Sequence, residues 1–250
     1  MARKKGGGGG RQRARQRAQY DELDKYPVMP PHAFARIVRD KQTLNIIYQI
    51  IEPPLTKKEQ EQRDEIMDIF IRSLTANIEE IDSNPEAYVR TAMDKVIKSY
   101  SMKINKKSKS KLFYYLRRDL IGYGKMDVLM NDVNVEDISL DGTNVPIFAY
   151  HRKFESVETT CVWPTDEELE SYVIKLAQRC GKHISVAEPL LDATLMDGSR
   201  IVMKLGHEIS TRGSAFCIRR FKDDPFSPAD IVAFRTCLLY TSDAADERNS

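Results

Sequence analysis

The chain has 250 residues, of which 41% are hydrophobic and 8% aromatic, so its composition supports a packed core and excludes disorder throughout. The formal net charge is only +2, yet seven of the first twenty residues are Arg or Lys and none is acidic, so a basic segment precedes a mildly acidic body. No apolar stretch approaches the roughly 20 residues of a membrane-spanning helix, and the basic N-terminus lacks the hydrophobic segment of a secretory signal, so we expect a cytoplasmic protein.

The cysteines show no C-x-x-C pair and no metal-ligand spacing with the histidines. We therefore expect them to be small buried side chains in a reducing compartment. The four cysteines are Cys161, Cys180, Cys217 and Cys237.

Residues 1–25 are assigned to a disordered basic tail. Gly6–Gly10 and an Arg/Gln repeat leave the first part of this segment with too little apolar surface to offset the entropy lost on ordering. The prolines of residues 27–31 predict an extended segment, and alternating apolar side chains in residues 44–50 predict a short strand, which Pro53-Pro54 ends.

Residues 56–122 have the periodicity of three helices. Thr56 and Glu59 make a capping box at the start of the first, and Ser83 or Asn84 caps the second, with a proline at its first position. A glycine after the third helix, Gly122 or Gly124, ends it. The apolar stripes are interpreted as core rather than as a cofactor site; they comprise Ile66, Ile69, Phe70, Leu74 and Ile78, then Tyr88, Ala92, Val96 and Tyr100, then Leu112, Phe113, Leu116 and Leu120.

From residue 126 the apolar period becomes that of strands. The dipeptides Asp141-Gly142 and Asp197-Gly198 are strong turn signals, and an amphipathic helix over residues 166–180 interrupts the strands. Helices segregated against a mostly antiparallel sheet make α+β the predicted fold class. The predicted strands cover residues 135–140, 145–150, 156–162, 193–196, 200–205 and 215–219.

The predicted domains are a helical N-terminal subdomain over residues 26–122, an α+β domain over 123–225, and the start of a linker helix over 226–236. From residue 237 the chain reads CLLYTSDAADE, which resembles the translation of a sequencing-library transposon adaptor. We therefore exclude residues 237–250 from reasoning about fold and function, as a non-native tail. A natural amphipathic tail is the alternative.

A second basic run spans residues 103–118. Together with the basic tail it would suit an anionic surface, either phospholipid or nucleic acid. A solvated tail and a solvated helix face are the alternative interpretation.

Several stretches, in their order along residues 26–236, resemble the type II/IV secretion ATPase superfamily, in the archaeal branch that drives archaella, pili and secretion. Each stretch alone is a weak signal, because Asp-Gly turns are common, but their order and spacing together are specific. The stretches are Tyr48–Leu55 with Glu59, Val135–Gly142, Val145 with His151, Pro189 with Asp192-Ala193, Asp197–Arg200, Ser210–Ser214 and Cys217–Phe221.

The resemblance implies that residues 123–225 form a nucleotide lid, which closes over ATP bound to a following RecA-like domain. It also implies a homo-oligomeric ring, a hexamer, that couples hydrolysis of ATP with Mg²⁺ to a polytopic membrane platform protein at the inner face of the cell membrane. Anionic lipid would suit the basic tail, and nucleic acid is not an expected partner.

By the same resemblance, Arg200 and Arg219 match the family arginines that reach nucleotide phosphates, while Arg212 and Arg220 match less closely. Arginine suits this role because its planar guanidinium is always charged and contacts a phosphate with two parallel hydrogen bonds. Arg219 and Arg220 are neighbours on one strand, so their side chains leave opposite faces and at most one of them can enter a shared site. No catalytic residue and no metal ligand are predicted within this chain.

The chain contains no P-loop. That motif, G-x-x-x-x-G-K-S/T after a strand, cradles phosphates with backbone N–H groups and one lysine, and Gly6–Gly10 lacks both the lysine and the hydroxyl residue. We therefore expect the N-terminal part of an ATPase, truncated before its Walker A motif and inactive alone. The alternative is a non-enzymatic α+β binding module whose basic arms dock on anionic lipid or nucleic acid. In that case Arg200 pairs at the surface with Asp192 or Asp197.

Overall fold

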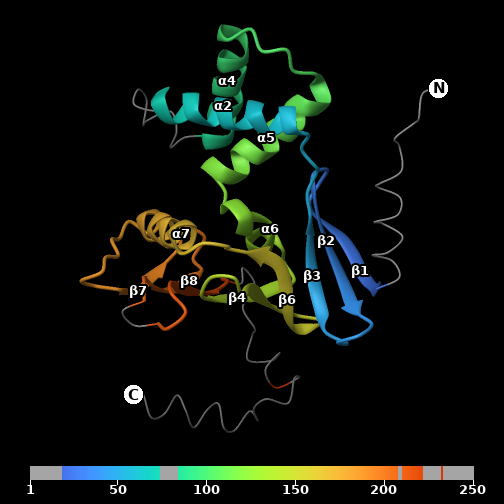
Figure 1. Cartoon of the computed structure of the whole chain (residues 1–250), viewed down its shortest axis with the longest axis vertical. Helices are drawn as coiled ribbons and strands as arrows, with labels where there is room; N and C mark the ends of the chain where they lie inside the picture. Colours follow the sequence, from blue (N-terminus) through green and yellow to red (C-terminus); the bar gives the residue numbers. More distant parts are fainter. Residues whose placement is uncertain (1–18, 74–83, 208–209, 222–231, 233–250) are drawn as a thin grey trace, which may run out of the picture. The chain divides into compact units, whose positions relative to one another are not determined.

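The computed structural model describes residues 19–73, 84–207, 210–221 and 232. Within these residues, a nine-stranded, mostly antiparallel sheet and five α-helices form an α+β fold, as predicted. The strand order is β1-β2-β3-β6-β5-β4-β9-β8-β7, and of these neighbours only β3 and β6 run parallel (Figure 1). The strands are β1 Tyr20–Met29, β2 Ala33–Asp40, β3 Ile46–Ile51, β4 Val135–Asp141, β5 Pro146–His151, β6 Glu155–Val162, β7 Leu190–Thr194, β8 Arg200–Lys204 and β9 Ala215–Arg219.

The chain divides into two compact units, Met1–Arg220 and Phe221–Ser250, and every one of these strands belongs to the first. The predicted linker helix over residues 226–236 lies outside the described residues apart from Val232, and so does the adaptor-like segment 237–250. No helix among the described residues is long and apolar enough to span a bilayer.

The strands β1 and β2 were not predicted. Residues 20–25, assigned to the disordered tail, are the first part of β1, and strands rather than helices occupy most of residues 26–51. In β2 the residues Arg36, Arg39 and Asp40 interrupt the apolar residues, and four of the ten residues of β1 are charged, so neither segment shows a clear strand pattern locally. These two segments become strands because β1 pairs with β2, and β2 pairs with β3, through hydrogen bonds between residues that are distant in sequence. The predicted strand over residues 44–50 is confirmed as β3.

A buried hydrogen-bond network ties these strands to the rest of the sheet. Asp132, which is 1% exposed, accepts hydrogen bonds from the hydroxyls of Tyr26 at 2.6 Å and Tyr48 at 2.7 Å. The Tyr26 hydroxyl also lies 3.0 Å from Nε2 of the buried His151. The network therefore joins β1 and β3 to the loop before β4 and to the end of β5.

All three predicted N-terminal helices are present, as α2 Lys57–Ser73, α4 Pro85–Ser99 and α5 Lys106–Leu120 (Figure 1). The side chain of Asn84 accepts a hydrogen bond at the start of α4, with Pro85 as the first helical residue, as predicted. The helices share an apolar cluster, whereas Leu74 and Ile78 of the predicted stripe lie outside the described residues. The buried members of the cluster are Ile66, Phe70, Val89, Met93, Val96, Leu112 and Leu116.

The capping box at the start of α2 extends into a tertiary contact. Glu59 accepts the backbone N–H of Thr56 at 2.8 Å, and its second oxygen accepts the hydroxyl of Ser108 on α5 at 2.7 Å. Lys111 adds an ion pair at 3.6 Å. The backbone hydrogen bond, then the Ser108 hydroxyl, lower the pKa of Glu59 to about 2, although burial works in the opposite direction.

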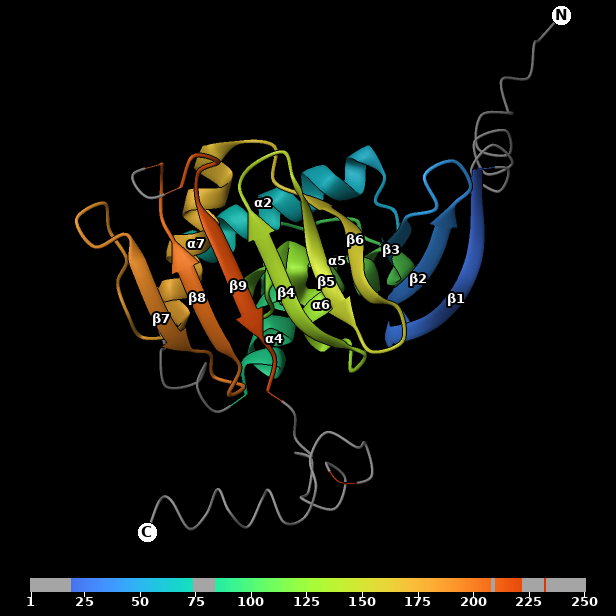
Figure 2. The same cartoon turned by 90° about the horizontal axis from the view of Figure 1, so that it is seen from below.

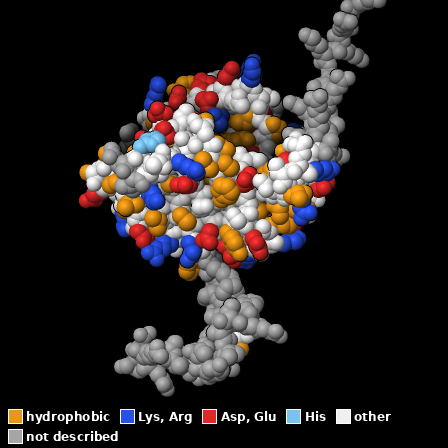
Figure 3. Space-filling view, turned by 60° about the horizontal axis from the view of Figure 1, so that its bottom comes forward, with side chains coloured by type: hydrophobic (Ala, Val, Ile, Leu, Met, Phe, Trp, Pro, Cys, Tyr) orange, Lys and Arg blue, Asp and Glu red, His pale blue; other side chains and the backbone are white. Residues whose placement is uncertain are grey.

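Helices cover one face of the sheet, and no helix of the described residues covers the other, which we call the open face. The helix α7 Asp166–Arg179, the short helix α6 Asp127–Asn131 and the 3₁₀ turn Gly124–Met126 lie behind the sheet in the view of Figure 2. Their apolar residues pack with the inward side chains of the strands around the buried Trp163. The opposite face shows apolar side chains interspersed with both signs of charge (Figure 3).

Candidate functional site: an arginine pair on the open face

Arg200 and Arg219 are direct partners in the sheet. Arg200 is the first residue of β8 and Arg219 the last of β9, and the register pairs their Cα atoms across the two antiparallel strands. The next residues inward, Ile201 and Ile218, are also paired and are both fully buried. Since side chains alternate between faces, both arginines leave the sheet on its open face.

Each arginine makes an ion pair with an exposed or half-exposed carboxylate. Arg200 holds Asp192 of β7 through two hydrogen bonds, of 2.6 and 3.2 Å, and Arg219 holds Asp137 of β4 at 3.2 Å. The hydrogen bond from Arg200 lowers the pKa of Asp192. The guanidinium side chains nevertheless stay 70% and 80% exposed, so the ion pairs contribute little to stability. A stronger external anion can therefore compete for both cations.

The turn between β7 and β8 sets the position of Arg200. Asp197 accepts hydrogen bonds from the backbone N–H and from the hydroxyl of Ser199, both at 3.0 Å. Gly198 between them has a φ of +84°, which favours glycine. Asp197 is thus used within the turn, and of the two aspartates considered for Arg200, Asp192 is its partner. Asp192 itself lies in a strand.

A small hollow lies beside the pair on the same face. It has a volume of about 200 Å³, and its walls include Val202 and Cys217, the next outward residues of β8 and β9. Cys217 is exposed, which corrects the prediction of buried cysteines; Cys161 is buried as predicted, Cys180 is half-buried, and Cys237 lies outside the described residues. Neither arginine lines the hollow, whose other walls include Asp141 and Lys204 further along the strands.

Arg220 does not join the pair. It follows Arg219 just beyond the end of β9. Its Nη1 donates to the backbone carbonyls of Asp132 and Val135, and its backbone N–H donates to Glu136 at 2.8 Å. This arrangement holds the start of β4 against the end of β9.

Arg212 lies in the loop between β8 and β9, at the opposite end of these strands from Arg200 and Arg219. Its backbone packs against the turn after β4: a Cβ added at Gly142, whose φ is +106°, would lie 2.3 Å from the carbonyl oxygen of Arg212. Of the four arginines indicated by the sequence, the fold thus brings together two.

Sequence reasoning missed the neighbours of the pair across β4 and β5. Asp137 pairs in register with Tyr150, which is 44% exposed on the same open face. The alternation of buried and exposed residues along β4 and β5 could have indicated that Asp137 and Tyr150 face outward. It places them beside the arginines only once the strand order is known.

The site fits phosphate better than a metal ion. Two guanidinium groups on adjacent strands offer donors to an anion, whereas the nearby carboxylates, Asp137 and Asp192, are each held by an arginine. Among the described residues, no group of three His, Cys, Asp or Glu side chains lies close enough to hold a metal ion.

No protein-family model matches the chain. The uncharacterized protein MJ1288 of Methanocaldococcus jannaschii is 41% identical over 164 residues, which are 65% of this chain and 65% of that protein. The uncharacterized protein MJ0900 of the same organism is 30% identical over 216 residues, 85% of this chain and 38% of its own length. The chain therefore spans less than two thirds of the length of these curated relatives.

Among solved structures, the chain is similar to the VirB11 ATPase from the Brucella suis type IV secretion system in complex with sulphate. The TM-score is 0.38 and the identity 16%, over 54% of this chain and 44% of that one. A likeness at this level is too low to support an argument about function.

Proposed function

We propose that the protein containing this chain is a P-loop ATPase of the secretion and pilus-assembly type. In this proposal the described region lies over ATP bound to a following RecA-like domain, and Arg200 and Arg219 contact its phosphates. The ordered motifs of residues 26–236 support the proposal, and its main structural support is the direct pairing of Arg200 with Arg219 on an open face.

Both guanidinium groups are largely exposed, and each is paired with one carboxylate. A phosphate group carries more charge than a single carboxylate and accepts the same parallel pair of hydrogen bonds. Binding of a nucleotide would therefore draw Arg200 and Arg219 from Asp192 and Asp137 at little cost. Positive charge near the transferred phosphoryl group also lowers the barrier to its transfer.

Catalysis requires parts that the 250 residues do not include, since no G-x-x-x-x-G-K-S/T motif occurs among them. The phosphate cradle and the residues that hold Mg²⁺ would come from the RecA-like domain. The proposal extends to a hexameric ring that acts on a membrane platform protein from the cytoplasmic side, with the basic N-terminal residues near anionic lipid. Arg212 and Arg220 are given no phosphate contact in it, because of where they lie.

The test is ATP turnover by the complete protein, obtained by sequencing the gene beyond the codon for Thr236. A P-loop some tens of residues further on is expected. Arg200→Ala and Arg219→Ala should each lower kcat at least about tenfold, within the range seen when a cation at a transferring phosphoryl group is removed.

The matched control is Arg72→Ala, because Arg72 is exposed on α2 and makes no ion pair with a described residue. It should turn over ATP as the unmodified protein does, and circular dichroism should show all three variants folded. Unchanged turnover in both Arg200→Ala and Arg219→Ala would remove the lid assignment.

A further inference from the structure

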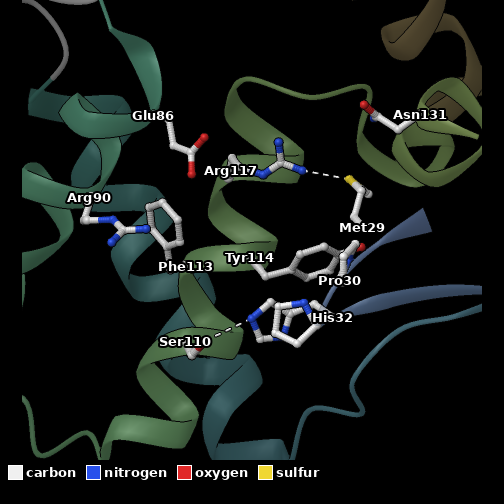
Figure 4. Close-up of a pocket in the computed structure, with 11 residues that line it drawn as sticks. Met29, Pro30, His32, Glu86, Arg90, Ser110, Phe113, Tyr114, Arg117 and Asn131 are labelled. Carbon is white, nitrogen blue, oxygen red and sulfur yellow. Dashed lines mark hydrogen bonds between the residues drawn. The ribbon is translucent and has the colours of Figure 1, made fainter. Parts of the chain in front are cut away.

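A second cavity lies between the turn joining β1 to β2 and the helices α4 and α5 (Figure 4). Its volume is about 460 Å³, within the roughly 300–1,000 Å³ typical of small-molecule sites. None of the four arginines considered above lines it. It is therefore a separate candidate site.

The helix α5 forms one wall with a single face. Ser110, Phe113, Tyr114 and Arg117 all line the cavity, and their spacing of three, four and seven residues places them along one side of the helix. The turn that contains Pro30 forms the facing wall. Together these residues make an apolar and aromatic surface with a cation at one end.

Two arginines supply positive charge at that end. The guanidinium carbon of Arg90, on α4, lies 4.6 Å from the ring centroid of Phe113, and Arg90 makes no ion pair with any carboxylate of the described chain. Arg117 uses only Nη2, which donates to Asp127 at 3.2 Å and to the sulfur of Met29 at 2.9 Å. Its Nε and Nη1 have no partner among the described residues, so both arginines keep donors for a ligand.

The remaining polar groups also face the cavity. Glu86 is the one carboxylate in its lining; in the view of Figure 4 it lies between Arg90, which stacks on Phe113, and Arg117, yet it is not ion-paired with either. At the other end Nε2 of His32 lies 3.0 Å from the hydroxyl of Ser110. Burial lowers the pKa of His32, so near pH 7 the charged groups of the lining are two arginines and one glutamate.

We infer that this cavity binds a small organic anion. Its carboxylate or phosphate group pairs with Arg90 and Arg117, and its apolar or aromatic body packs against Pro30, Phe113 and Tyr114. Convergent polar groups in a mostly apolar concavity are the usual composition of such sites. The two anionic groups share the chemistry that arginine recognises, and experiment distinguishes them.

Isothermal titration calorimetry of the whole chain tests the inference with phenyl phosphate and with benzoate. At least one of the two should bind saturably, and inorganic phosphate should bind at least about tenfold more weakly because it lacks the apolar body. The tighter of the two organic probes shows whether the site favours phosphate or carboxylate.

Two variants with opposite expected effects separate recognition from a folding defect. Arg90→Gln should weaken binding about fivefold or more by removing an anion donor, and Glu86→Gln should tighten it about twofold by removing repulsion. Lys95→Gln is the control, because Lys95 is exposed on α4 outside the cavity. Absence of saturable binding by both organic probes up to about 10 mM, or equal affinities in Arg90→Gln and Lys95→Gln, would overturn the inference.

Discussion

Replacing Glu59 by Gln tests how strongly one charge joins α2 to α5. Gln keeps the shape of the side chain and can still accept the N–H of Thr56 through its one carbonyl oxygen, so the change removes the charge and the second acceptor, which receives the Ser108 hydroxyl. Two hydrogen bonds reach Glu59, from Thr56 at 2.8 Å and from Ser108 at 2.7 Å. A hydrogen bond to a charged group contributes about 1 kcal/mol more than a neutral one, so the expected loss of unfolding free energy is about 2 kcal/mol at pH 7.

The pH dependence of this loss follows from the pKa of Glu59, which is about 2 in the folded chain against an ordinary value of 4.5. A carboxyl group whose pKa is lowered by folding stabilises the folded state fully above its unfolded pKa. The difference between the Glu59→Gln variant and the unmodified chain should therefore be constant from pH 7 to about pH 5. It should shrink as the pH falls below 4.5 and vanish only below the folded pKa of about 2.

Urea denaturation followed by circular dichroism at several pH values measures this free energy, and the melting temperature should fall by about 4–8 °C at pH 7. Glu61→Gln is the matched control, because Glu61 is exposed on the same helix. Ser108→Ala completes a double-mutant cycle and should lose most of its own cost when Gln occupies position 59. Equal costs for Glu59→Gln and Glu61→Gln, or a cost that does not change below pH 4.5, would refute the reasoning.

Two further substitutions test contacts that hold the sheet together. Tyr48→Phe removes the 2.7 Å hydrogen bond to the buried Asp132 and should lower the unfolding free energy, measured by urea denaturation, by about 1.5–3 kcal/mol. The control Tyr100→Phe, at a residue that is 58% exposed, should cost almost nothing. Gly142→Ala places a Cβ 2.3 Å from the carbonyl of Arg212 and should cost at least about 2 kcal/mol. Gly181 also has a positive φ, of +67°, but this lies in the left-handed region that L residues can adopt, and a Cβ there would meet nothing within 4 Å. Gly181→Ala should therefore cost about 1 kcal/mol, and equal melting temperatures for the two glycine variants would contradict the close packing of the Arg212 loop.

Much of the fold follows from local patterns. The capping residues at Thr56 and Asn84 and the 3.6-residue apolar period predicted α2 and α4, because helical hydrogen bonds join residues only four apart. The turn signals at Asp141-Gly142 and Asp197-Gly198 correctly separated strands. These signals sufficed for the α+β class.

The edge strands and the site depended on contacts that are distant in sequence. β1 is polar along much of its length, and its place in the sheet rests on pairing with β2 and on the bond from Tyr26 to Asp132, more than 100 residues away. The sequence indicated that Arg219 and Arg220 point to opposite faces, but not which of them faces solvent.

The sequence by itself thus indicated the helices α2, α4, α5 and α7, the strands β3 to β9 and the arginines worth testing, because these signals depend on neighbours within a few residues. Only the tertiary structure decided that Arg200 lies opposite Arg219, that Arg212 and Arg220 lie elsewhere, and that Arg90 and Arg117 line one cavity. Strand register and helix packing are set by burial summed over many residues far apart along the chain, and no local pattern contains that sum.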